Sequence, residues 1–407
     1  MRQTITPLLL LLPLLLGLAT QEPPQPSEDE LEQFKTLSVS FENLRQSLSA
    51  LGGISDENIE IVRSMRLQFT EYNSANPNHD RGIATELQLA IWLQEDAIID
   101  TLFPKLIGLA DDGRAIRKSW TDYYLRANNY QRLIAILSGS STDPADDPQG
   151  VLTLGKCYFA EQRFEDAIIV LESIPEEATA AKPGIAIQID RLRGICESYI
   201  ELWALEQVLR SNQDAADDLP RVELITSRGR IVLELFEVEA PNTVANFISL
   251  VEAGFYDESK FHRVEANSMA RGGDPNTKPG GEGLPGQGGP GYQIHDEHTR
   301  EGARNHFTGS LSMANTGKPH TGGSRFFLTH EPTPDLNGKR TVFGRILEGL
   351  DVARSLKIND VLESATVLRK RDHEYSPTTL PEEDGSLPSK LAVPPTPRPA
   401  PSSPPPN

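Results

Sequence analysis

The chain has 407 residues, a formal net charge of -19 at pH 7 and a hydrophobic fraction of 38%. This length exceeds the size at which one hydrophobic core keeps growing, so two or more domains are expected. The acidic balance argues against a nucleic-acid binder, because neutralising phosphates requires an excess of Lys and Arg. We therefore expect no nucleic-acid partner.

The first residues have the pattern of a secretory signal. Arg2 supplies a positive charge, an apolar run extends from Leu8 to Leu16, and the small residue Ala19 stands at a cleavage position. The run is shorter than the roughly 20 apolar residues of a bilayer span, and no later segment approaches that length. We predict that residues 1–19 are removed and that the protein is exported, periplasmic or secreted, without a stable membrane span. An uncleaved N-terminal anchor is the alternative.

Residues 20–78 are predicted to form a helical N-terminal segment, because apolar residues recur there every three to four positions. Gly52 and Gly53 end a first helix, and a second is expected to open near Ser55. The stretch SANPNHDRG, residues 74–82, has the composition of a loop or boundary.

The helical pattern continues over residues 79–215, where it repeats. Apolar positions recur with an offset of 34 residues (154 - 120 = 34), and the pairs are Trp120 and Leu154, Tyr124 and Tyr158, Tyr130 and Phe164, Leu133 and Ala167, Ile134 and Ile168, and Leu137 and Leu171. This is the period of the tetratricopeptide helix-turn-helix, which LGKCYFAEQRFEDAIIVLESIP resembles. Gly194 and Trp203 suggest a third copy at a different offset. Such repeats form a concave face that binds a protein partner; an ordinary helical bundle is the alternative.

The chain contains two cysteines, Cys157 and Cys196, so no disulfide framework holds the fold together. In an oxidising compartment the two could pair. Two buried small apolar residues in helices are the alternative.

The pattern changes at Leu219. The segment RVELITSRGRIVLELF alternates apolar and polar residues and predicts a hairpin turning at Arg228-Gly229. An amphipathic helix is expected to begin at Pro241 and to stop at Gly254. Short strand-like runs follow, and they are KFHRV, GSLSMAN, SRFFLTH, TVFGRIL and ATVLRKR. Many short strands with few helices favour a β-barrel or sandwich.

The last stretch, residues 376–407, is dominated by Pro and Ser. Such a composition cannot build a core and favours extended polyproline conformations. We predict a disordered tail.

Two motifs in the β region carry little chemistry by themselves. GEGLPG, residues 281–286, has dinucleotide-motif spacing, but Pro285 removes an amide donor and no helix start follows. HDEH, residues 295–298, with His306 nearby, could suggest a metal, yet neighbouring strand residues point to opposite faces. A solvated polar cluster at a turn is the better interpretation. We expect neither a metal nor a cofactor.

Two longer stretches are more specific. FHRVEANSMARGGD, residues 261–274, is followed by GSLSMANTGKPHTGGSRFFLTHEPTPDLNGKRTVFGRILEGLD, residues 309–351. Together they resemble the cyclophilin family of peptidyl-prolyl cis/trans isomerases, from about Arg221 to Arg371 within a domain predicted at 219–375. The resemblance implies a closed antiparallel eight-stranded β-barrel with two capping helices. The chain is thus predicted to be a multidomain α plus β protein, with the tetratricopeptide-like helices before the barrel.

Prolyl isomerisation turns an amide whose resonance barrier is about 18 to 20 kcal/mol. Rotation makes the prolyl nitrogen basic, so a catalyst must grip the ring in an apolar pocket and aim a fixed donor at that nitrogen. A guanidinium suits this role, because it is planar, charged and multidentate. The resemblance implies six site residues: the donor Arg263, the pocket residues Phe327, Met269 and Leu336, and the main-chain contacts Ala314 and Asn315. From the residues alone, Phe327 and Met269 could instead be interior core.

Several positions depart from the family pattern. Ser268 stands where the family usually has a pocket Phe, Arg271 where it has the Gln that orients the guanidinium, and Arg340 where it has a His. Arg325 replaces a Gln, and Asp335 stands where a Trp is often found. Two like charges in contact cost about 1 kcal/mol in water and more in a lower dielectric.

The substituted arginines Arg271 and Arg340 therefore need counter-ions, for which the candidates are Asp335, Asp274 and Glu265. Two hypotheses remain. The chain is an exported isomerase that assists the folding of extracytoplasmic proteins, takes proline-containing polypeptides as clients and recruits partners on its helical repeats. Alternatively, it is a catalytically weak cyclophilin-like scaffold that binds peptides and prefers acidic segments.

Overall fold

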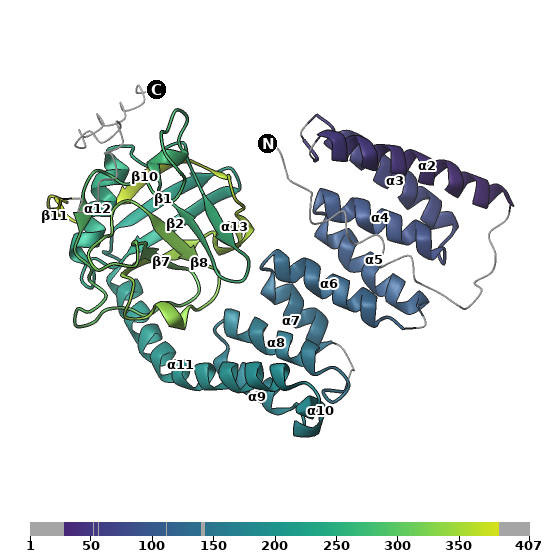
Figure 1. The fold of residues 1–407 in the computed structure, drawn as a ribbon, viewed down its shortest axis with the longest axis horizontal. Coiled ribbons are helices and arrows are strands. Elements are labelled where there is room, and N and C mark those ends of the chain that lie inside the picture. The colour runs from purple at the N-terminus through teal and green to yellow at the C-terminus, as the bar shows by residue number, and fades with distance from the viewer. Residues whose placement is uncertain (1–27, 52, 56, 111, 140–142, 382–407) are drawn as a thin grey trace. The chain divides into compact units, whose positions relative to one another are not determined.

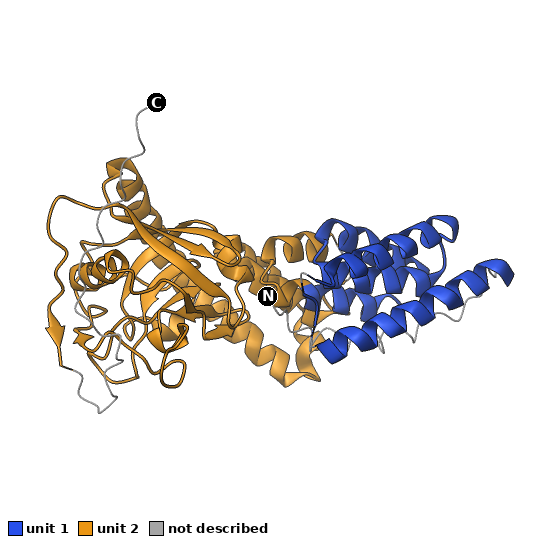
Figure 2. Ribbon diagram, turned by 90° about the horizontal axis from the view of Figure 1, so that it is seen from above, with its two compact units in different colours: residues 1–123 blue, residues 124–407 orange. Residues whose placement is uncertain are grey.

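The structure, a computed structural model, describes residues 28–381 except 52, 56, 111 and 140–142. The predicted signal peptide and residues 382–407 of the predicted tail lie outside the described residues. The chain divides into two compact units, residues 1–123 and 124–407, which Figure 2 colours separately. The first is helical and the second combines helices with a curled antiparallel sheet (Figure 1). This order of helices followed by sheet confirms the predicted fold class.

Helices whose apolar faces pack together make up the first unit. They are α2 (Glu28–Leu51), α3 (Ile59–Ala75), α4 (Asp80–Leu93), α5 (Asp96–Leu109) and α6 (Arg114–Arg126), within which the boundary between the units falls. Phe41 of α2 stacks on Trp92 of α4 with ring centroids 5.6 Å apart. Phe103 of α5 stacks on Trp120 of α6 at 5.5 Å. The predicted loop over residues 74–82 is shorter in the structure, because α4 already begins at Asp80.

The second unit begins with further helices. They are α7 (Tyr130–Ser138), α8 (Pro148–Ala160), α9 (Phe164–Glu172), α10 (Glu176–Ala180) and α11 (Pro183–Ala216). Asn129 caps α7 by accepting from the backbone amide of Arg132, and Asp147 caps α8 by accepting from that of Gly150. Short polar caps before apolar runs therefore set where these helices begin.

The ends of the helices reproduce the 34-residue offset of the sequence. Helix α6 ends at Arg126 and α8 at Ala160, while α7 begins at Tyr130 and α9 at Phe164 (160 - 126 = 34; 164 - 130 = 34). The third copy suggested by Gly194 and Trp203 is wrong, since both residues lie inside the uninterrupted helix α11. No turn follows Gly194, because a single glycine costs a helix only about 1 kcal/mol and α11 continues through it from Pro183 to Ala216. The tetratricopeptide assignment itself stays a prediction.

Both cysteines are buried free thiols. Burial raises the pKa of Cys157 and that of Cys196 to about 12. Cys196 packs in the apolar core of α8, α9 and α11. Of the two alternatives for the cysteines, the structure shows the buried apolar residues and not the disulfide.

The sheet of the second unit begins with the predicted hairpin. Strands β1 (Arg221–Thr226) and β2 (Gly229–Leu235) are antiparallel, and Thr226 faces Gly229 across the turn. The remaining strands are β3 (Ser259–Lys260), β4 (Arg263–Glu265), β5 (Met269–Gly272), β6 (Gln293–Ile294), β7 (Ser310–Met313), β8 (Phe326–Thr329), β9 (Val342–Glu348), β10 (Val361–Arg369) and β11 (Thr379–Leu380). The five predicted strand-like runs each contribute to one or more of these strands.

The main sheet curls so that its two edge strands are neighbours in the sequence. Its order is β3-β10-β1-β2-β9-β7-β8-β5-β4, and only Phe261 and His262 separate β3 from β4. The amide of Phe261 donates to the Asp360 carbonyl beside β10, and the amide of His262 donates to the Arg271 carbonyl in β5. One segment thus bonds to both ends of the sheet. Counting β3 and β4 as one interrupted strand gives the eight strands that the resemblance implies.

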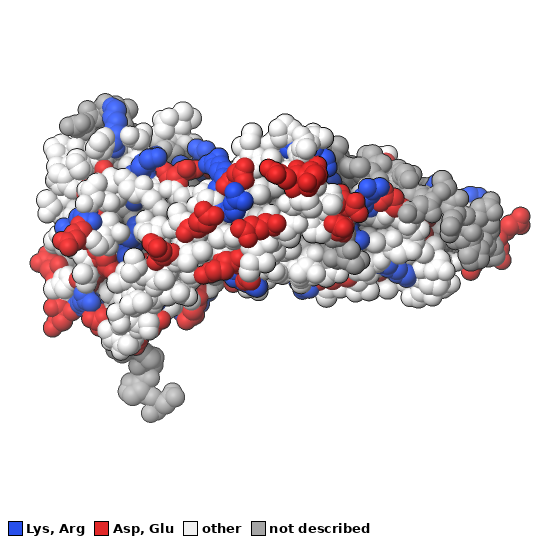
Figure 3. All heavy atoms as spheres, turned by 90° about the horizontal axis from the view of Figure 1, so that it is seen from below, with Lys and Arg blue, Asp and Glu red and all other residues white. Residues whose placement is uncertain are grey.

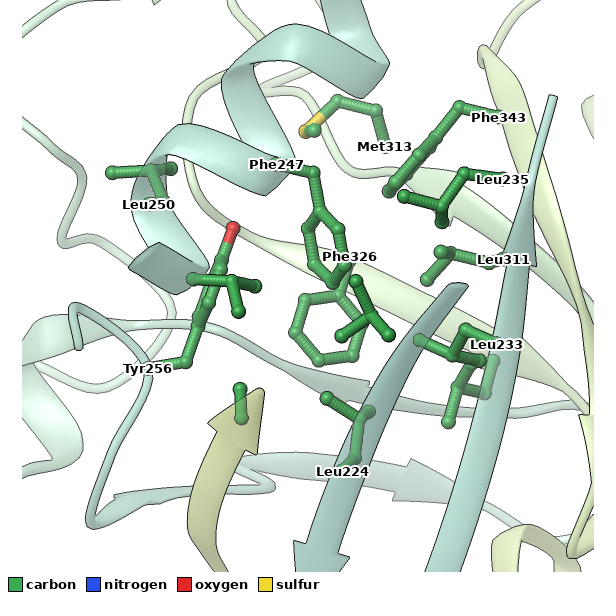
Figure 4. Packing of buried hydrophobic residues seen from close by; sticks show 14 of the residues in the cluster. Leu224, Leu233, Leu235, Phe247, Leu250, Tyr256, Leu311, Met313, Phe326 and Phe343 are labelled. Atoms are coloured by element: carbon green, nitrogen blue, oxygen red, sulfur yellow. The ribbon is translucent and has the colours of Figure 1, made fainter. Parts of the chain in front are cut away.

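Two helices cover this sheet, α12 (Pro241–Glu252) and α13 (Leu350–Ser355). Figure 4 shows Phe247 of α12 among the aromatic and aliphatic side chains of the sheet. Its ring lies 5.7 Å from that of Phe326 and 5.3 Å from that of Phe343. Fully burying one such side chain stabilises the fold by roughly 1.5 to 3 kcal/mol. The apolar side chains of α12 and those on the inner face of the sheet therefore pack in one interior core.

The polar cluster predicted at residues 295–298 differs from the expectation. Glu297 is buried, and its carboxylate accepts from the amides of Asn242 and Thr243 at the start of α12. His306 is also fully buried. The prediction of a solvated cluster is wrong for these two residues. Their polar local sequence suggested exposure, but segments distant in the sequence pack over them. In the part of the chain that the structure describes, no group of three His, Cys, Asp or Glu side chains could hold a metal ion.

The glycine-rich GEGLPG segment is a loop organised by a carboxylate. Asp274 is fully buried and accepts from the amides of Gly286 and Gly288. Gly273, which precedes it, has φ of +80°, and a Cβ there would lie 2.5 Å from the Ser324 carbonyl. This explains why the GGD motif needs its second glycine.

Acidic and basic side chains are both present on the surface. Figure 3 shows Asp and Glu over the visible face with Lys and Arg among them, in a chain of formal net charge -19. Among residues 28–381, apart from those not described, we find no helix that has both the length and the apolar character of a membrane span.

Candidate active site

Four residues on adjacent strands form one row across the sheet. In the antiparallel register Arg263 of β4 faces Arg271 of β5, Arg271 faces Phe327 of β8, and Phe327 faces Ser312 of β7. Directly opposed residues carry their side chains on the same face of a sheet. The structure therefore brings the predicted donor Arg263 and the predicted pocket residue Phe327 to one face, with Arg271 between them.

Met269 and Phe327 lie on this outer face although both are buried, with exposed fractions of 4% and 2%. Their strand neighbours Ala270, Phe326 and Leu328 belong to the interior core. Because side chains alternate along a strand, Met269 and Phe327 point the other way. They are buried but do not belong to the interior core cluster, and their part in a proline pocket stays a prediction. An apolar surface on the outside of the barrel is what a proline ring needs.

His306 forms the back of this apolar surface. Its ring stacks on that of Phe327, with centroids 5.9 Å apart and an interplanar angle of 6°. Burial lowers the pKa of His306 to about 4, so the ring is neutral at pH 7. Its Nε2 lies 3.0 Å from Oγ of Ser312, the last member of the row. The ring thus supports Phe327 from behind and adds no charge to the pocket.

Leu336 lies on a short 3-10 helix, η3 (Pro334–Leu336), that is fastened to His306. Asn337, the next residue, accepts from the His306 amide at 2.8 Å through Oδ1. The amide of Thr333, before η3, donates to the His306 carbonyl at 3.3 Å. Both ends of η3 are therefore held by the residue that stacks on Phe327.

Ala314 and Asn315 follow β7 and continue toward a second hollow. The amide of Ala314 donates to the Arg325 carbonyl, so it is engaged within the domain. Asn315 lines a cavity of about 600 Å³, together with Asp296, His320, Lys318, Lys339 and Arg340. Arg340, which lines this cavity, is one of the cations whose charge lowers the pKa of Arg271.

Arg263 is positioned on the rim and not in the interior. Its side chain is 60% exposed, and its guanidinium pairs with Glu265 of the same strand. Residues two apart on a strand share a face, which is why this pair forms. Of the three candidate counter-ions, Glu265 is thus the one that meets a site arginine.

Arg271 is half-buried and poorly compensated. Among the described residues its Nε has no hydrogen-bond partner, and the structure places its guanidinium 6.0 Å from the ring centre of Phe327. Burial lowers the pKa of Arg271, and the charges of Arg263, Arg340 and Arg325 lower it further. Glu265 acts in the opposite direction. An arginine here adds positive potential to the pocket wall.

The other two candidate counter-ions have different partners. The carboxylate of Asp335 lies 3.4 Å from Arg191 of α11, with both side chains largely exposed. The carboxylate of Asp274 accepts hydrogen bonds from backbone amides of its own loop, those of Asn276 and Gly288. Burial lowers the pKa of Arg340, and Asp296 is the carboxylate that raises it. The counter-ion expected of Asp335 is therefore wrong for Arg340.

Ser268 closes the turn between β4 and β5. Its carbonyl accepts from the His330 amide at 2.7 Å, and the preceding Asn267 has φ of 57°. The amide of Asn267 donates to Oδ1 of Asn128, just before α7. Because Ser268 is small and polar, it contributes no apolar side chain to the pocket wall. The hydrogen bond from Asn267 to Asn128 holds the turn that contains Ser268 against the helical region.

The arrangement combines an apolar surface, a fixed guanidinium and further cations. Such a site can hold a proline ring and direct a charged donor toward a nitrogen that becomes basic as the amide rotates. The surrounding arginines favour anionic groups next to that proline. The roles of the individual residues stay predictions.

Two further residues at the site, His306 and Tyr199, were not predicted to belong to it. His306 was grouped with a solvated cluster, and only its place eight residues before the Ala314-Asn315 stretch (314 - 306 = 8) linked it to the pocket. Tyr199 contacts His306 from helix α11. A contact between positions 107 residues apart leaves no signal in local periodicity.

Comparisons with known proteins match the part of the chain that forms this sheet. The family model for cyclophilin type peptidyl-prolyl cis-trans isomerases matches residues 221–372. The chain is 44% identical to peptidyl-prolyl cis-trans isomerase B of Bacillus subtilis over 144 residues, which cover 35% of this chain and 94% of that protein. It is 44% identical to a peptidyl-prolyl cis-trans isomerase of Synechococcus elongatus over 147 residues, 36% of this chain and 94% of that protein.

Among solved structures, the chain is similar to a cyclophilin type isomerase of Cryptosporidium parvum. The two are 28% identical, and the match covers 38% of this chain and 99% of that one with a TM-score of 0.33. The matched family model begins at residue 221, after the last residue of α11.

Proposed function

The chain belongs to the cyclophilin family of peptidyl-prolyl cis/trans isomerases, and from this we propose that it isomerises X-Pro bonds with acidic flanking residues in exported proteins. The observation that carries the proposal is the row Arg263, Arg271, Phe327. It sets an apolar proline surface beside two guanidinium groups on the outer face of the barrel.

The charge at the site supports the substrate class. Arg271 lacks a hydrogen-bond partner at Nε among the described residues, and Arg340 and Lys339 line the neighbouring cavity. A carboxylate next to the proline would offset this potential, whereas a lysine there would add to it. We therefore expect kcat/KM to rank Glu-Pro above Ala-Pro and Ala-Pro above Lys-Pro.

The test is a prolyl-isomerisation assay of the full chain on peptides that differ only in the residue before proline. The advantage of Glu-Pro should shrink as salt rises from about 0.05 M to about 0.5 M, because the Debye length falls. Equal rates on Glu-Pro and Lys-Pro at low salt would contradict the acidic preference. Rates equal to the uncatalysed rate on every peptide would contradict the isomerase itself.

One observation favours the second candidate, a peptide-binding scaffold with weak catalysis. A permanent charge at Arg271 stands beside Arg263, and Glu265 pairs with Arg263. A scaffold would bind Glu-Pro peptides with measurable affinity while leaving their isomerisation rate near the uncatalysed value. Calorimetric binding beside the kinetic assay separates the two.

Export and a role in folding belong to the same proposal, and the N-terminal pattern of residues 1–19 supports them. The mature protein should begin at Thr20 and be recovered outside the cytoplasm. Mass spectrometry of the protein purified from its host checks this. A protein that keeps Met1 in the cytoplasmic fraction would contradict export and leave the isomerase proposal standing.

A further inference from the structure

Helix α11, which precedes the sheet, reaches the back of the candidate proline pocket. Tyr199 of α11 is 1% exposed, and its hydroxyl donates to the His306 carbonyl at 3.3 Å. The same hydroxyl accepts from Nδ2 of Asn337 at 2.8 Å. Burial raises the pKa of Tyr199 to about 12, so the hydroxyl keeps the proton that it donates.

These bonds fix the orientation of both partners. Because Nδ2 of Asn337 donates to Tyr199, its Oδ1 faces His306, where it accepts from the backbone amide and lies 3.0 Å from Nδ1. Nδ1 of His306 therefore carries the proton, and Nε2 lies 3.0 Å from Oγ of Ser312, whose hydroxyl is also 3.0 Å from the Thr341 carbonyl. Each polar side-chain atom in this network has a partner. A buried network in this state is rigid.

The network ends on two walls of the pocket. His306 stacks on Phe327, and Asn337 directly follows Leu336. If the hydroxyl of Tyr199 were absent, Asn337 would lose its donor partner and the His306 carbonyl one of its two donors. The two walls would then be free to move relative to each other.

We propose that Tyr199 is a positioning residue of the isomerase site, which acts through Asn337 and His306 to hold Phe327 and Leu336 at the spacing that grips a proline ring. The inference depends on the proposed use of this pocket for X-Pro substrates. It assigns the helical region a part in the reaction that is separate from recruiting partners.

The test compares Tyr199→Phe with Asp214→Asn in the full chain. The first variant keeps the ring, which packs on Phe307 at 5.5 Å, and removes only the hydroxyl. The control removes a different contact between α11 and the barrel, the one from Asp214 to Arg345. Tyr199→Phe should lower kcat/KM about five- to tenfold, mainly through KM, because the two hydrogen bonds that hold the pocket walls in place are lost. Asp214→Asn should leave kcat and KM unchanged.

A purely structural role for Tyr199 would give another result. Measured below the melting temperature of every variant, Tyr199→Phe would then match the wild type in both kcat and KM, which would overturn the inference. A double-mutant comparison sharpens this. If Tyr199 acts through Asn337, the pair Tyr199→Phe with Asn337→Ala should be no worse than Asn337→Ala alone. Additive losses would overturn the proposed route.

Nuclear magnetic resonance of the His306 ring proton tests the inference even if the protein proves to be inactive. The Nδ1 proton of His306 should give an observable signal, and in Tyr199→Phe it should exchange faster with water because the network opens. An unchanged exchange rate would overturn the inference. Failure of the proposed function, by contrast, would appear as absent catalysis in the wild type with this signal intact.

Discussion

Arg263 and Arg271 are cross-strand partners in the antiparallel pair of β4 and β5. One is a rim residue paired with Glu265, and the other is half-buried between Arg263 and Phe327. Their charges repel, yet both side chains face the surface on which substrate is proposed to lie. The site therefore has one guanidinium placed as a donor and a second that sets the potential around it.

Replacing Arg271 with Gln should raise kcat/KM on neutral X-Pro peptides about fivefold, because a repulsion of about 1 kcal/mol on Arg263 is removed. The variant should also resist urea better than the wild type, since a half-buried charge is gone. Arg325→Gln is the matched control. Burial lowers the pKa of Arg325 but Asp274 raises it, so no gain is expected there. A loss of activity on neutral peptides in Arg271→Gln would contradict this account.

Arg263→Ala should lower kcat about 100- to 1000-fold, the usual effect of losing one transition-state donor. Unfolding free energy should change by less than about 0.5 kcal/mol, because the side chain is largely exposed. Arg263→Lys should recover only part of the rate, since it restores the charge without the planar fork. Arg300→Ala, an exposed arginine outside the row, serves as the control. Retained activity in Arg263→Ala would mean that another group donates.

Glu206→Ala should cost about 3 to 5 kcal/mol of unfolding free energy, because it leaves a buried guanidinium without its main partner. Glu206 of α11 holds Arg304 through two bonds of 2.8 and 2.7 Å, and both side chains are at most 5% exposed. Asp190→Ala on the same helix is the control, since Asp190 pairs with Arg193 at the surface. That change should cost less than about 0.5 kcal/mol. Urea unfolding measures both, and equal costs would contradict the buried pair.

Stability should fall between about pH 6.5 and pH 4 through His306. Burial lowers the pKa of His306 to about 4, while an unfolded histidine has a pKa near 6.5. Between these values the unfolded chain binds the extra proton, so the contribution is complete above pH 6.5 and is lost as pH falls toward 4. The nearby charges of Arg340 and His298 also oppose protonation.

The measurement is the slope of unfolding free energy against pH in wild type and in His306→Gln. The variant should lose about 1.4 kcal/mol per pH unit of slope near pH 5, the value for one proton. Burial raises the pKa of Glu331 to about 8. Glu331 therefore changes the slope of unfolding free energy against pH equally in the wild type and the variant, and its contribution cancels in the comparison. The exposed His295 provides the control His295→Gln. Identical slopes in wild type and His306→Gln would contradict a neutral buried ring.

A fragment of residues 219–381 should be less stable and less active than one of residues 114–381. Phe307 of the barrel is 1% exposed and packs on Tyr199 and Trp203 of α11. The shorter fragment lacks the two rings that pack on Phe307, and it lacks Glu206, one of the two carboxylates that pair with Arg304. Thermal melting and isomerisation of the two fragments check this. Equal melting temperatures would show that α11 contributes nothing to the barrel.

Much of the second unit could be predicted because its signals are local. The hairpin at Arg228-Gly229 and helix α12 follow from period and turn residues. Arg263 and Phe327 were assigned to one site by the family resemblance, and the strand register places both on one face of the sheet.

What could not be predicted depends on contacts between distant segments. His306 and Glu297 carry polar side chains in a polar stretch, so their burial becomes visible only when α11 and α12 pack on them. Likewise Gly194 looked like a repeat position, but one uninterrupted helix passes through it. Local composition cannot distinguish these outcomes.

Helix α11 joins two sets of contacts that the sequence would assign to different domains. Its first half packs with α8 and α9 around Cys196, and its second half carries Glu206 and Asp214 to the barrel. Phe307 of the barrel belongs to the same apolar cluster as Phe164 of α9. Residues 124–381 should therefore unfold as one cooperative block, with a single calorimetric transition for the helices and the barrel together.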